Sequence, residues 1–281
     1  MLTASELKFL LRAERLRLTK RLGQHHLIDS RIVRDIVERS DLSPRDTVVE
    51  IGAGLGALTE WLSQRAGRVI AVESDRRIAR LLAERMRARK NIEVVCQDIL
   101  EFDWQRFADL TVIGAIPYHI TSPILVSVCD GRRAIRKAIL ILQREVAQRL
   151  LAHPGEKAYG RLSVLAQYYW EVTRLLKVPR GAFFPQPDVD SSCVQLAGRL
   201  RPPVQVASES TFFALVKAAF SQRRKTLVNC LSQGREAGMG RKEAERVLLE
   251  QGLPTAVRGE SLSLDQFAAL ANALHPATRL R

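Results

Sequence analysis

The sequence lacks several features that would restrict its location and chemistry. No apolar run approaches the roughly 18 residues that a membrane-spanning helix needs. The four cysteines are widely spaced and form no C-x-x-C pair, so neither a zinc site nor a disulfide framework is predicted. The first residues mix acids into a basic helical pattern and lack the apolar core of a signal peptide. We therefore expect a cytoplasmic protein without a structural metal.

Positive charge is in excess. Lysine and arginine total 44 against 30 acidic residues, which gives a formal net charge of +14. Hydrophobic residues make up 46% of the 281 residues, a fraction typical of a folded protein rather than a disordered one. This charge favours a polyanionic partner, and nucleic acid above all. A basic stretch at 12–21 is either a solvated helix face or an RNA-contacting arm.

The pattern of apolar residues divides the chain into three parts. Residues 1–45 form a basic segment with helical spacing. Residues 46–200 contain short apolar runs that alternate with amphipathic helices, which predicts an α/β domain with a doubly wound parallel sheet. Two later runs, 171–178 and 192–197, are predicted to add antiparallel edge strands. The five predicted parallel strands are 47–51, 68–72, 92–95, 110–113 and 138–142.

The C-terminal part has a different pattern. A linker at 198–203 contains two prolines, one glycine and two arginines, and has no apolar periodicity. Beyond it, residues 204–281 contain helical patterns at 212–230, 241–251 and 264–274, without strands. We expect a small all-helical domain there.

A glycine-rich loop follows the first predicted strand. Gly52, Gly54 and Gly56 are spaced G-x-G-x-G, and Glu50 stands two residues before the first of them. Glycines at a strand-to-helix turn let the backbone approach a ligand, and the helix N-terminus offers free N–H groups. A dinucleotide-binding loop would instead be spaced G-x-G-x-x-G. The observed spacing is the pattern of class I S-adenosylmethionine (SAM) methyltransferases.

Carboxylates stand at the ends of the next two predicted strands. Glu73 ends the second strand and is placed to accept hydrogen bonds from ribose hydroxyls. Asp98 follows the third and is placed to accept one from an adenine amino group. Because open α/β sheets bind ligands at the carboxyl ends of their strands, the loop and both acids should line one site.

The fourth predicted strand leads into a motif that resembles a known family. The segment from Gly114 to Tyr118, G-A-I-P-Y, is similar to the N-[LI]-P-Y element of RNA adenine dimethyltransferases except at the asparagine. Further segments resemble L-G-Q-N-F-L-x-D, Q-[KR]-E-V-A-x-R-[LM], Y-G-R-L-S, F-x-P-x-P-x-V-D-S and A-F-x-Q-R-R-K-T-L of the same family. They are residues 22–29, 142–150, 159–163, 183–191 and 219–227. The chain therefore resembles the KsgA-type small-subunit rRNA adenine N6,N6-dimethyltransferases over nearly its whole length.

The resemblance implies a class I SAM-methyltransferase fold with SAM as the cofactor. The family usually has asparagine in place of His25, and imidazole can still donate or accept one hydrogen bond. His26, His119 and His153 are predicted to be structural, since attack by an exocyclic amine needs no strong base. The residues that match the family's SAM contacts are His25, Leu27, Gly52, Gly54, Glu73, Asp98 and Ala115.

The resemblance also implies roles around the target base. The family asparagine at position 115 and a carbonyl near Pro117 would accept hydrogen bonds from the N6 amine and aim its lone pair at the methyl group. Tyr118 would stack on the flipped-out adenine, and Phe183 or Phe184 would cover its other face. Because Ala115 has no acceptor, we expect weakened catalysis with binding retained.

Two basic clusters are candidates for contacts with RNA. Arg223, Arg224 and Lys225 lie in a family-matching motif and are predicted to contact RNA or to pack within the domain. A second cluster, at 131–137, is either a set of phosphate contacts or solvated surface.

Three functions fit these observations. The leading one is a monomeric SAM-dependent enzyme that dimethylates N6 of adenines in small-subunit rRNA, within a ribosomal assembly particle. The alternative, favoured by Ala115, is an rRNA-binding assembly factor that keeps the SAM fold but has lost efficient catalysis. An Erm-like enzyme acting on large-subunit rRNA is less favoured, because those enzymes match Y-G-R-L-S and P-x-V-D-S less well.

Overall fold

The computed structural model describes residues 2–16, 18, 25–233 and 239–275. Part of the basic stretch at 12–21 and the start of the motif at 22–29 lie outside the described residues. The chain forms two compact units, Met1–Ala147 with Glu171–Gly198, and Gln148–Trp170 with Arg199–Arg281. Residues 148–170, which the apolar pattern assigns to the middle segment, group with the C-terminal unit. The proposed division at 1–45, 46–200 and 204–281 stays a prediction.

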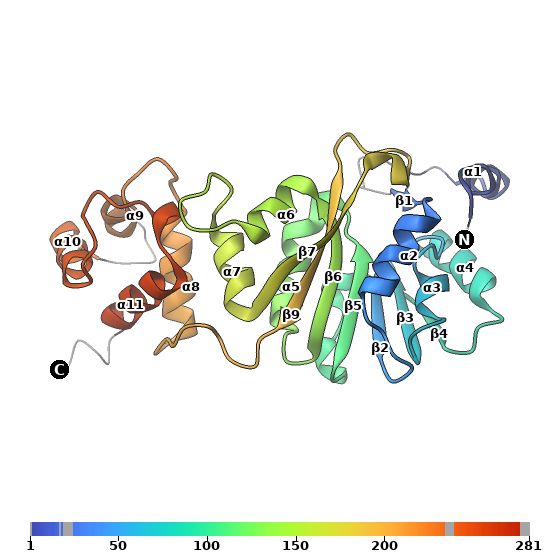
Figure 1. The fold of residues 1–281 in the computed structure, drawn as a ribbon, viewed down its shortest axis with the longest axis horizontal. Helices are drawn as coiled ribbons and strands as arrows, with labels where there is room; N and C mark the ends of the chain where they lie inside the picture. Colours follow the sequence, from blue (N-terminus) through green and yellow to red (C-terminus); the bar gives the residue numbers. More distant parts are fainter. Residues whose placement is uncertain (1, 17, 19–24, 234–238, 276–281) are drawn as a thin grey trace. The chain divides into compact units, whose positions relative to one another are not determined.

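A seven-stranded sheet forms the centre of the first unit, with strand order β4-β3-β2-β5-β6-β9-β7 (Figure 1). The first five strands in this order are parallel, which confirms the predicted α/β sheet. The inner strands β2, β3 and β5 are mostly buried, as a sheet covered on both faces requires, whereas the edge strand β4 is only partly buried. The strands are β2 (Thr47–Ile51), β3 (Arg68–Glu73), β4 (Ile92–Cys96), β5 (Leu110–Ala115), β6 (Ile135–Gln143), β7 (Trp170–Val178) and β9 (Ser191–Gly198).

One prediction about the sheet is wrong. The run at 192–197 was expected at an edge, but β9 pairs antiparallel with β6 and lies between β6 and β7. Four successive residues of β9, from Ser191 to Val194, are buried, as an interior strand requires. Only β7 takes the edge position expected for both runs.

Helices pack against this sheet, and two of them begin at aspartate caps. The Asp29 carboxylate accepts backbone N–H groups at the start of α2, and Asp75 does the same for α4. The helix after the glycine loop begins only at Thr59, since φ of +85° at Gly56 excludes a right-handed helix at that residue. The helices are α1 (Ala4–Ala13), α2 (Ser30–Arg39), α3 (Thr59–Leu62), α4 (Arg76–Met86), α5 (Thr121–Asp130) and α6 (Arg144–Leu151), and the short 3₁₀ turns are η2 (Ile99–Glu101), η3 (Trp104–Arg106), η4 (Tyr118–Ile120) and η5 (Arg180–Ala182).

A second, two-stranded sheet joins segments that are far apart in the sequence. β1 (His26–Leu27) pairs antiparallel with β8 (Phe183–Phe184), with His26 opposite Phe184 and Leu27 opposite Phe183. The Ile28 amide extends the pairing by donating to the Ala182 carbonyl at 2.8 Å. Two family motifs therefore meet at this small sheet.

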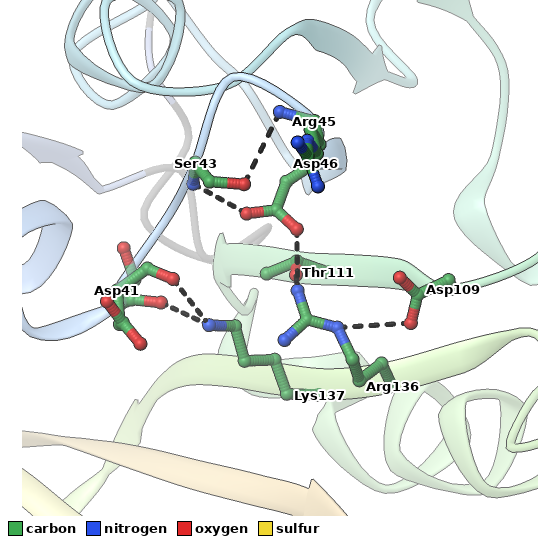
Figure 2. Close-up of polar contacts among 9 residues, drawn as sticks. Asp41, Ser43, Arg45, Asp46, Asp109, Thr111, Arg136 and Lys137 are labelled. Carbon is green, nitrogen blue, oxygen red and sulfur yellow. Dashed lines mark hydrogen bonds and ion pairs between the residues drawn. The ribbon is translucent and has the colours of Figure 1, made fainter.

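Lys137 is buried at the amino edge of the main sheet, and Figure 2 shows its contacts. Its ammonium group donates to the carbonyl of Ser40 and, at 3.0 Å, to that of Asp41. Both carbonyls lie just beyond the last turn of α2, where the helix dipole favours a cation. Lys137 is only 8% exposed, so it caps a helix and is neither solvated nor free to contact phosphate.

Arg136, beside it, is also engaged within the unit. Its guanidinium pairs with Asp46 at 2.6 Å and with Asp109 at 3.1 Å (Figure 2). These acids precede β2 and β5, so the arginine ties together the amino ends of neighbouring strands. Lys137 thus contradicts the prediction for its own position, whereas Arg136 is exposed with its charge paired, and the prediction for the rest of the 131–137 cluster stays open.

The second unit is helical, apart from the first residue of β7 (Figure 1). Its core contains a cluster of aromatic side chains, with the rings of Tyr168 and Phe212 5.0 Å apart. None of the helices in the described part of the chain is long and apolar enough to cross a membrane. The helices of this unit are α7 (Arg161–Tyr169), α8 (Glu209–Ala219), α9 (Leu227–Gln233), α10 (Arg241–Glu250) and α11 (Leu264–Leu274), with the 3₁₀ turn η6 (Gly259–Ser261).

The single helix predicted at 212–230 is two helices, separated by the turn at 220–226. The Ser221 hydroxyl donates to the Ala218 carbonyl at 2.7 Å, which satisfies a carbonyl at the end of α8. The amide of Leu227 donates outside its own helix, to Val257 at 2.7 Å. The family motif at 219–227 therefore forms a corner between two helices.

Candidate active site at the carboxyl edge of the sheet

A cavity of about 390 Å³ opens at the carboxyl ends of β4, β3, β2 and β5. These strands are neighbours in the sheet, so the loops that follow them lie side by side in the same order. The structure thus brings together residues that the sequence spreads over some ninety positions. The predicted site residues that line the cavity are His25, Gly52, Gly54, Glu73, Asp98, Ala115 and Pro117.

The glycine loop needs glycine for both backbone conformation and space. Gly52 and Gly54 have φ of +65° and +55°, values that other residues rarely adopt. A Cβ on Gly54 would lie 2.7 Å from ring atoms of His26, well inside van der Waals contact. The loop is therefore a cradle whose floor is backbone, with an imidazole packed directly against it.

Glu73 is held in one orientation by the backbone. Its Oε2 accepts the Gly54 amide and its Oε1 accepts the Asp75 amide, both at 2.9 Å. The side chain is largely buried, and this burial raises the pKa of Glu73. Each carboxylate oxygen has further acceptor capacity, so a fixed Glu73 suits a pair of neighbouring hydroxyl groups.

Asp98 lies at the adjacent strand end. Its Oδ1 accepts the Leu100 amide at 2.9 Å and begins the short turn η2. The side chain is exposed and lines the cavity, so its other oxygen can accept a hydrogen bond from a ligand.

Glu50 lies beneath the glycine loop and is fully buried. Burial raises the pKa of Glu50 to about 8, and Thr59 hydrogen bonds oppose the shift only in part. The Thr59 hydroxyl donates to Glu50 Oε2 at 2.5 Å. The acid that precedes the glycines is therefore neutral at moderately acidic pH in the folded protein.

This burial predicts a pH-dependent stability. The folded protein keeps the Glu50 proton up to about pH 8, whereas an unperturbed glutamate loses it near 4.5. The folded state therefore binds more protons in this window, and stability should fall by up to about 1.4 kcal/mol per pH unit as pH rises. Glu50→Gln should flatten this slope, as measured by urea unfolding near pH 5.5 and near pH 6.5.

The exposed acid Glu101 provides a control for that measurement. Glu101→Gln should keep the slope of the unsubstituted protein. Equal slopes for Glu50→Gln and the unsubstituted protein would show that Glu50 is ionised in the fold.

The motif after β5 forms a tight turn at the cavity. Ala115 ends β5, and Pro117 begins the 3₁₀ turn η4. The Pro117 carbonyl already accepts the Thr121 hydroxyl at 3.1 Å and the Ile120 amide at 3.2 Å. Its two lone pairs are thus occupied, which leaves the carbonyl of the preceding residue, Ile116, as the candidate backbone acceptor next to Pro117.

Tyr118 is half-buried beside the cavity. Its hydroxyl hydrogen-bonds to the Ser191 hydroxyl at 2.8 Å, and burial raises the pKa of the phenol. The His25 ring lies 5.4 Å from the Tyr118 ring, centre to centre. Because the Pro185 carbonyl can only accept, His25 Nδ1 must donate the 2.6 Å hydrogen bond between them. These contacts fix two rings next to one another.

The remaining predicted residues are not at the cavity wall. Phe183 is 4% exposed and packs with Leu27 in the core of the first unit, so its ring is not available to cover a base. This corrects the role inferred for Phe183. The other candidate, Phe184, is partly buried, with the Lys8 ammonium 5.1 Å from its ring centre.

Several lining residues were not predicted from the sequence as part of the site. Asp75 and Ile78 belong to the start of α4, which could have been inferred from the Asp75 cap signal. His26 stands where the family motif has phenylalanine, and this difference from the motif is the feature of the sequence that could have pointed to a role for His26 in the site. The additional lining residues are His26, Ser74, Asp75, Ile78, His119 and Ile120.

The candidate RNA contacts lie in the second unit. Arg223 is paired with Glu260 at 3.1 Å and donates to the Lys157 carbonyl, so it stabilises the helical unit. Arg224 and Lys225 are exposed in the same corner between α8 and α9. Within the described ranges, no group of three or more His, Cys, Asp or Glu side chains could hold a metal ion.

Known proteins resemble the chain over most of its length. A family model described as ribosomal RNA adenine dimethylase matches residues 15–274. The ribosomal RNA small subunit methyltransferase A of Geobacillus sp. (strain WCH70) is 44% identical over 264 residues, which are 91% of this chain and 91% of that protein. The protein of the same name from Moorella thermoacetica is 42% identical over 91% of this chain and 92% of its own length.

Solved structures give the same result. A dimethyladenosine transferase from Plasmodium falciparum superposes with a TM-score of 0.75 at 26% identity, covering 87% of this chain and 95% of that one. The 23S rRNA methyltransferase ErmE gives 0.69 at 29% identity, covering 88% and 98%. The predicted class I SAM-methyltransferase fold and the family resemblance are confirmed. The chain therefore belongs to the ribosomal RNA adenine dimethylase family.

Proposed function

We propose that this chain transfers methyl groups from SAM to N6 of adenines in small-subunit rRNA and forms dimethyladenosine. The observation that supports the proposal is the cavity in which Glu73 and Asp98 stand at adjacent strand ends beside the Pro117–Tyr118 turn. Relatives that are 41–44% identical carry the name of small-subunit rRNA methyltransferases. The ErmE structure, which acts on 23S rRNA, is 29% identical.

The residues of the cavity fit SAM. Along the strand order β4-β3-β2-β5, Asp98 would receive the adenine, Glu73 the ribose and the glycine loop the amino-acid end. A side chain on Gly54 would fill the cradle, and the glycine keeps it open. SAM supplies an electrophilic methyl group on a sulfonium, and in this order the methyl would face the turn that follows β5.

The chain's own residues would then position the target amine. An exocyclic adenine amine is a poor nucleophile, so alignment and electrostatics dominate the rate. The Ile116 carbonyl would accept one N–H, and Tyr118, held by Ser191, would stack on the extruded base. Ala115 offers no second acceptor, so we propose that catalysis is weakened while cofactor binding persists.

We also propose a setting for this reaction. The substrate would be rRNA within a small-subunit assembly particle in the cytoplasm, and the chain would act as a monomer. Arg224 and Lys225, exposed at a corner of the helical unit, would contact rRNA phosphates, and Arg223 would hold that corner in shape.

A second candidate function rests on Ala115. A chain that binds SAM and rRNA but lacks the asparagine acceptor could serve as an assembly factor with little turnover. Poorer alignment of the target amine would lower the rate of methyl transfer, but it would not remove the surface that binds rRNA.

One pair of measurements tests these functions. We expect SAM to bind in titration calorimetry and labelled methyl groups to enter unmethylated small subunits rather than large ones. SAM binding without incorporation would select the assembly-factor function, and incorporation into large subunits would select the Erm-like function. The absence of both SAM binding and incorporation would overturn the proposal.

A further inference from the structure

His26 has a buried nitrogen without a partner. Among the described residues, His26 Nε2 is the enclosed side-chain polar atom for which the structure shows no hydrogen bond. Burial lowers the pKa of His26 to about 4, so the ring is neutral at physiological pH. A neutral imidazole carries one N–H donor and one bare nitrogen acceptor.

The burial pattern favours one arrangement of the proton. An enclosed N–H without an acceptor is rarer in proteins than an enclosed acceptor without a donor. The favoured tautomer therefore has no proton on Nε2 and carries the single ring proton on Nδ1. Nδ1 is the ring nitrogen that faces Gly54, 2.7 Å from the position of a Cβ there.

The position of His26 matches one part of the ligand. Both His26 and Gly54 line the cavity, and Gly54 belongs to the loop after β2. In the pose proposed above, adenine and ribose occupy the ends of β4 and β3, so the loop after β2 receives the amino-acid end. β1 pairs with β8 and keeps the ring in this place.

The charges around the cavity strengthen this assignment. Three carboxylates line it, those of Glu73, Asp75 and Asp98, whereas no lysine or arginine of the described chain does. A ligand carboxylate therefore finds no cationic partner among those lining residues and depends on neutral donors. An N–H of His26 beside the glycine backbone is such a donor.

Resting on the proposed function, we infer that His26 Nδ1–H binds the α-carboxylate of SAM. The sequence predicts a structural role for His26, because attack by the exocyclic amine needs no strong base. The family motif has phenylalanine at this position. A phenylalanine there could pack against Gly54 but could not donate a hydrogen bond. His26 would thus be a cofactor-binding residue at a position where the family motif has phenylalanine.

Three ligands test the inference by calorimetry with the full-length protein. SAM and S-adenosylhomocysteine carry the amino-acid end, and 5′-methylthioadenosine lacks it. His26→Phe should weaken binding of the first two by about 10- to 100-fold, the range for a hydrogen bond to a charged group. Binding of methylthioadenosine should be unchanged.

Stability provides a readout that is independent of ligand. His26→Phe removes an unpaired buried nitrogen, so the melting temperature of the free protein should not fall. His26→Gln retains an N–H donor and should lose less SAM affinity than His26→Phe. His153→Phe, a substitution of an exposed histidine away from the cavity, should change neither property.

The outcomes separate this inference from the proposed function. Unchanged SAM affinity in His26→Phe, or an equal loss for all three ligands, would overturn the role of His26. If the unsubstituted protein binds none of the three, the proposed function itself fails.

Discussion

Ala115→Asn is expected to raise the rate of methyl transfer to small-subunit rRNA by about 10- to 100-fold. Ala115 ends β5 and lines the cavity immediately before the Ile116–Pro117 backbone. An asparagine there would add a side-chain oxygen that accepts an N–H from the target amine. A single positioned hydrogen bond contributes about 1–3 kcal/mol, which gives this range of rates.

The reason for the gain is alignment rather than affinity. The Pro117 carbonyl is occupied by Thr121 and Ile120, so in the proposed function the Ile116 carbonyl alone would accept from the amine. One acceptor leaves the amine free to rotate, and a second fixes the direction of its lone pair. The effect should therefore appear in the single-turnover rate at saturating SAM.

Ala115→Leu is the matched control, since leucine resembles asparagine in shape but has no acceptor. It should give no gain in rate, and the fold should be unchanged in circular dichroism. A rate for Ala115→Asn equal to that of the unsubstituted chain would show that the missing oxygen does not limit catalysis.

Lys137→Met is expected to lower the free energy of unfolding by about 2–4 kcal/mol. The substitution keeps most of the aliphatic length but removes the ammonium group that donates to Ser40 and Asp41 (Figure 2). Ser40 is fully buried, so its carbonyl would lose a donor where water does not replace it. The C-terminal end of α2 would also lose the cation that its dipole favours.

Chemical unfolding followed by circular dichroism measures this effect. The exposed Arg133, just before β6, provides a control. Arg133→Met should stay within about 0.5 kcal/mol of the unsubstituted protein. SAM affinity should be unchanged in both variants, since Lys137 lies at the amino edge of the sheet and the cavity at the carboxyl edge. A Lys137→Met variant as stable as the unsubstituted chain would contradict the capping role.

The sequence contained most of the information about the main sheet and its binding edge. Strands β2 and β3 are short and mainly apolar, because helices cover a parallel sheet on both faces. Glu73 and Asp98 could be found because each stands where such a run stops. The order of these strands places them at one cavity, and the usual topology of α/β folds makes that order predictable.

Features that depend on contacts between residues far apart in the sequence could not be predicted from such local patterns. β9 is an interior strand because it pairs with β6, a fact that its own residues do not encode. The pairing of His26 with Phe184 joins two-residue strands, which are too short to give any periodicity. Phe183 and Phe184 are identical in type, and only the fold decides that Phe183 belongs to the core.

In the helical unit, too, the local sequence pattern fails to predict where a helix ends. Residues 212–230 read as one amphipathic helix, yet Ser221 satisfies a terminal carbonyl of α8 and the chain turns. Leu227 then donates to Val257, some thirty residues ahead in the sequence. Local pattern predicts helical propensity, whereas the corner results from a contact that the pattern does not contain.

In the function proposed above, the small sheet of β1 and β8 would lie beside both SAM and the target base. β1 lies against the glycine loop through His26, and β8 continues into Pro185, whose carbonyl is bonded to His25 beside Tyr118. In the proposed function, SAM would contact this sheet at His26, and the extruded base would lie beside it at Tyr118. Any change in affinity that one ligand causes for the other through this sheet would, by thermodynamic reciprocity, be the same in both directions.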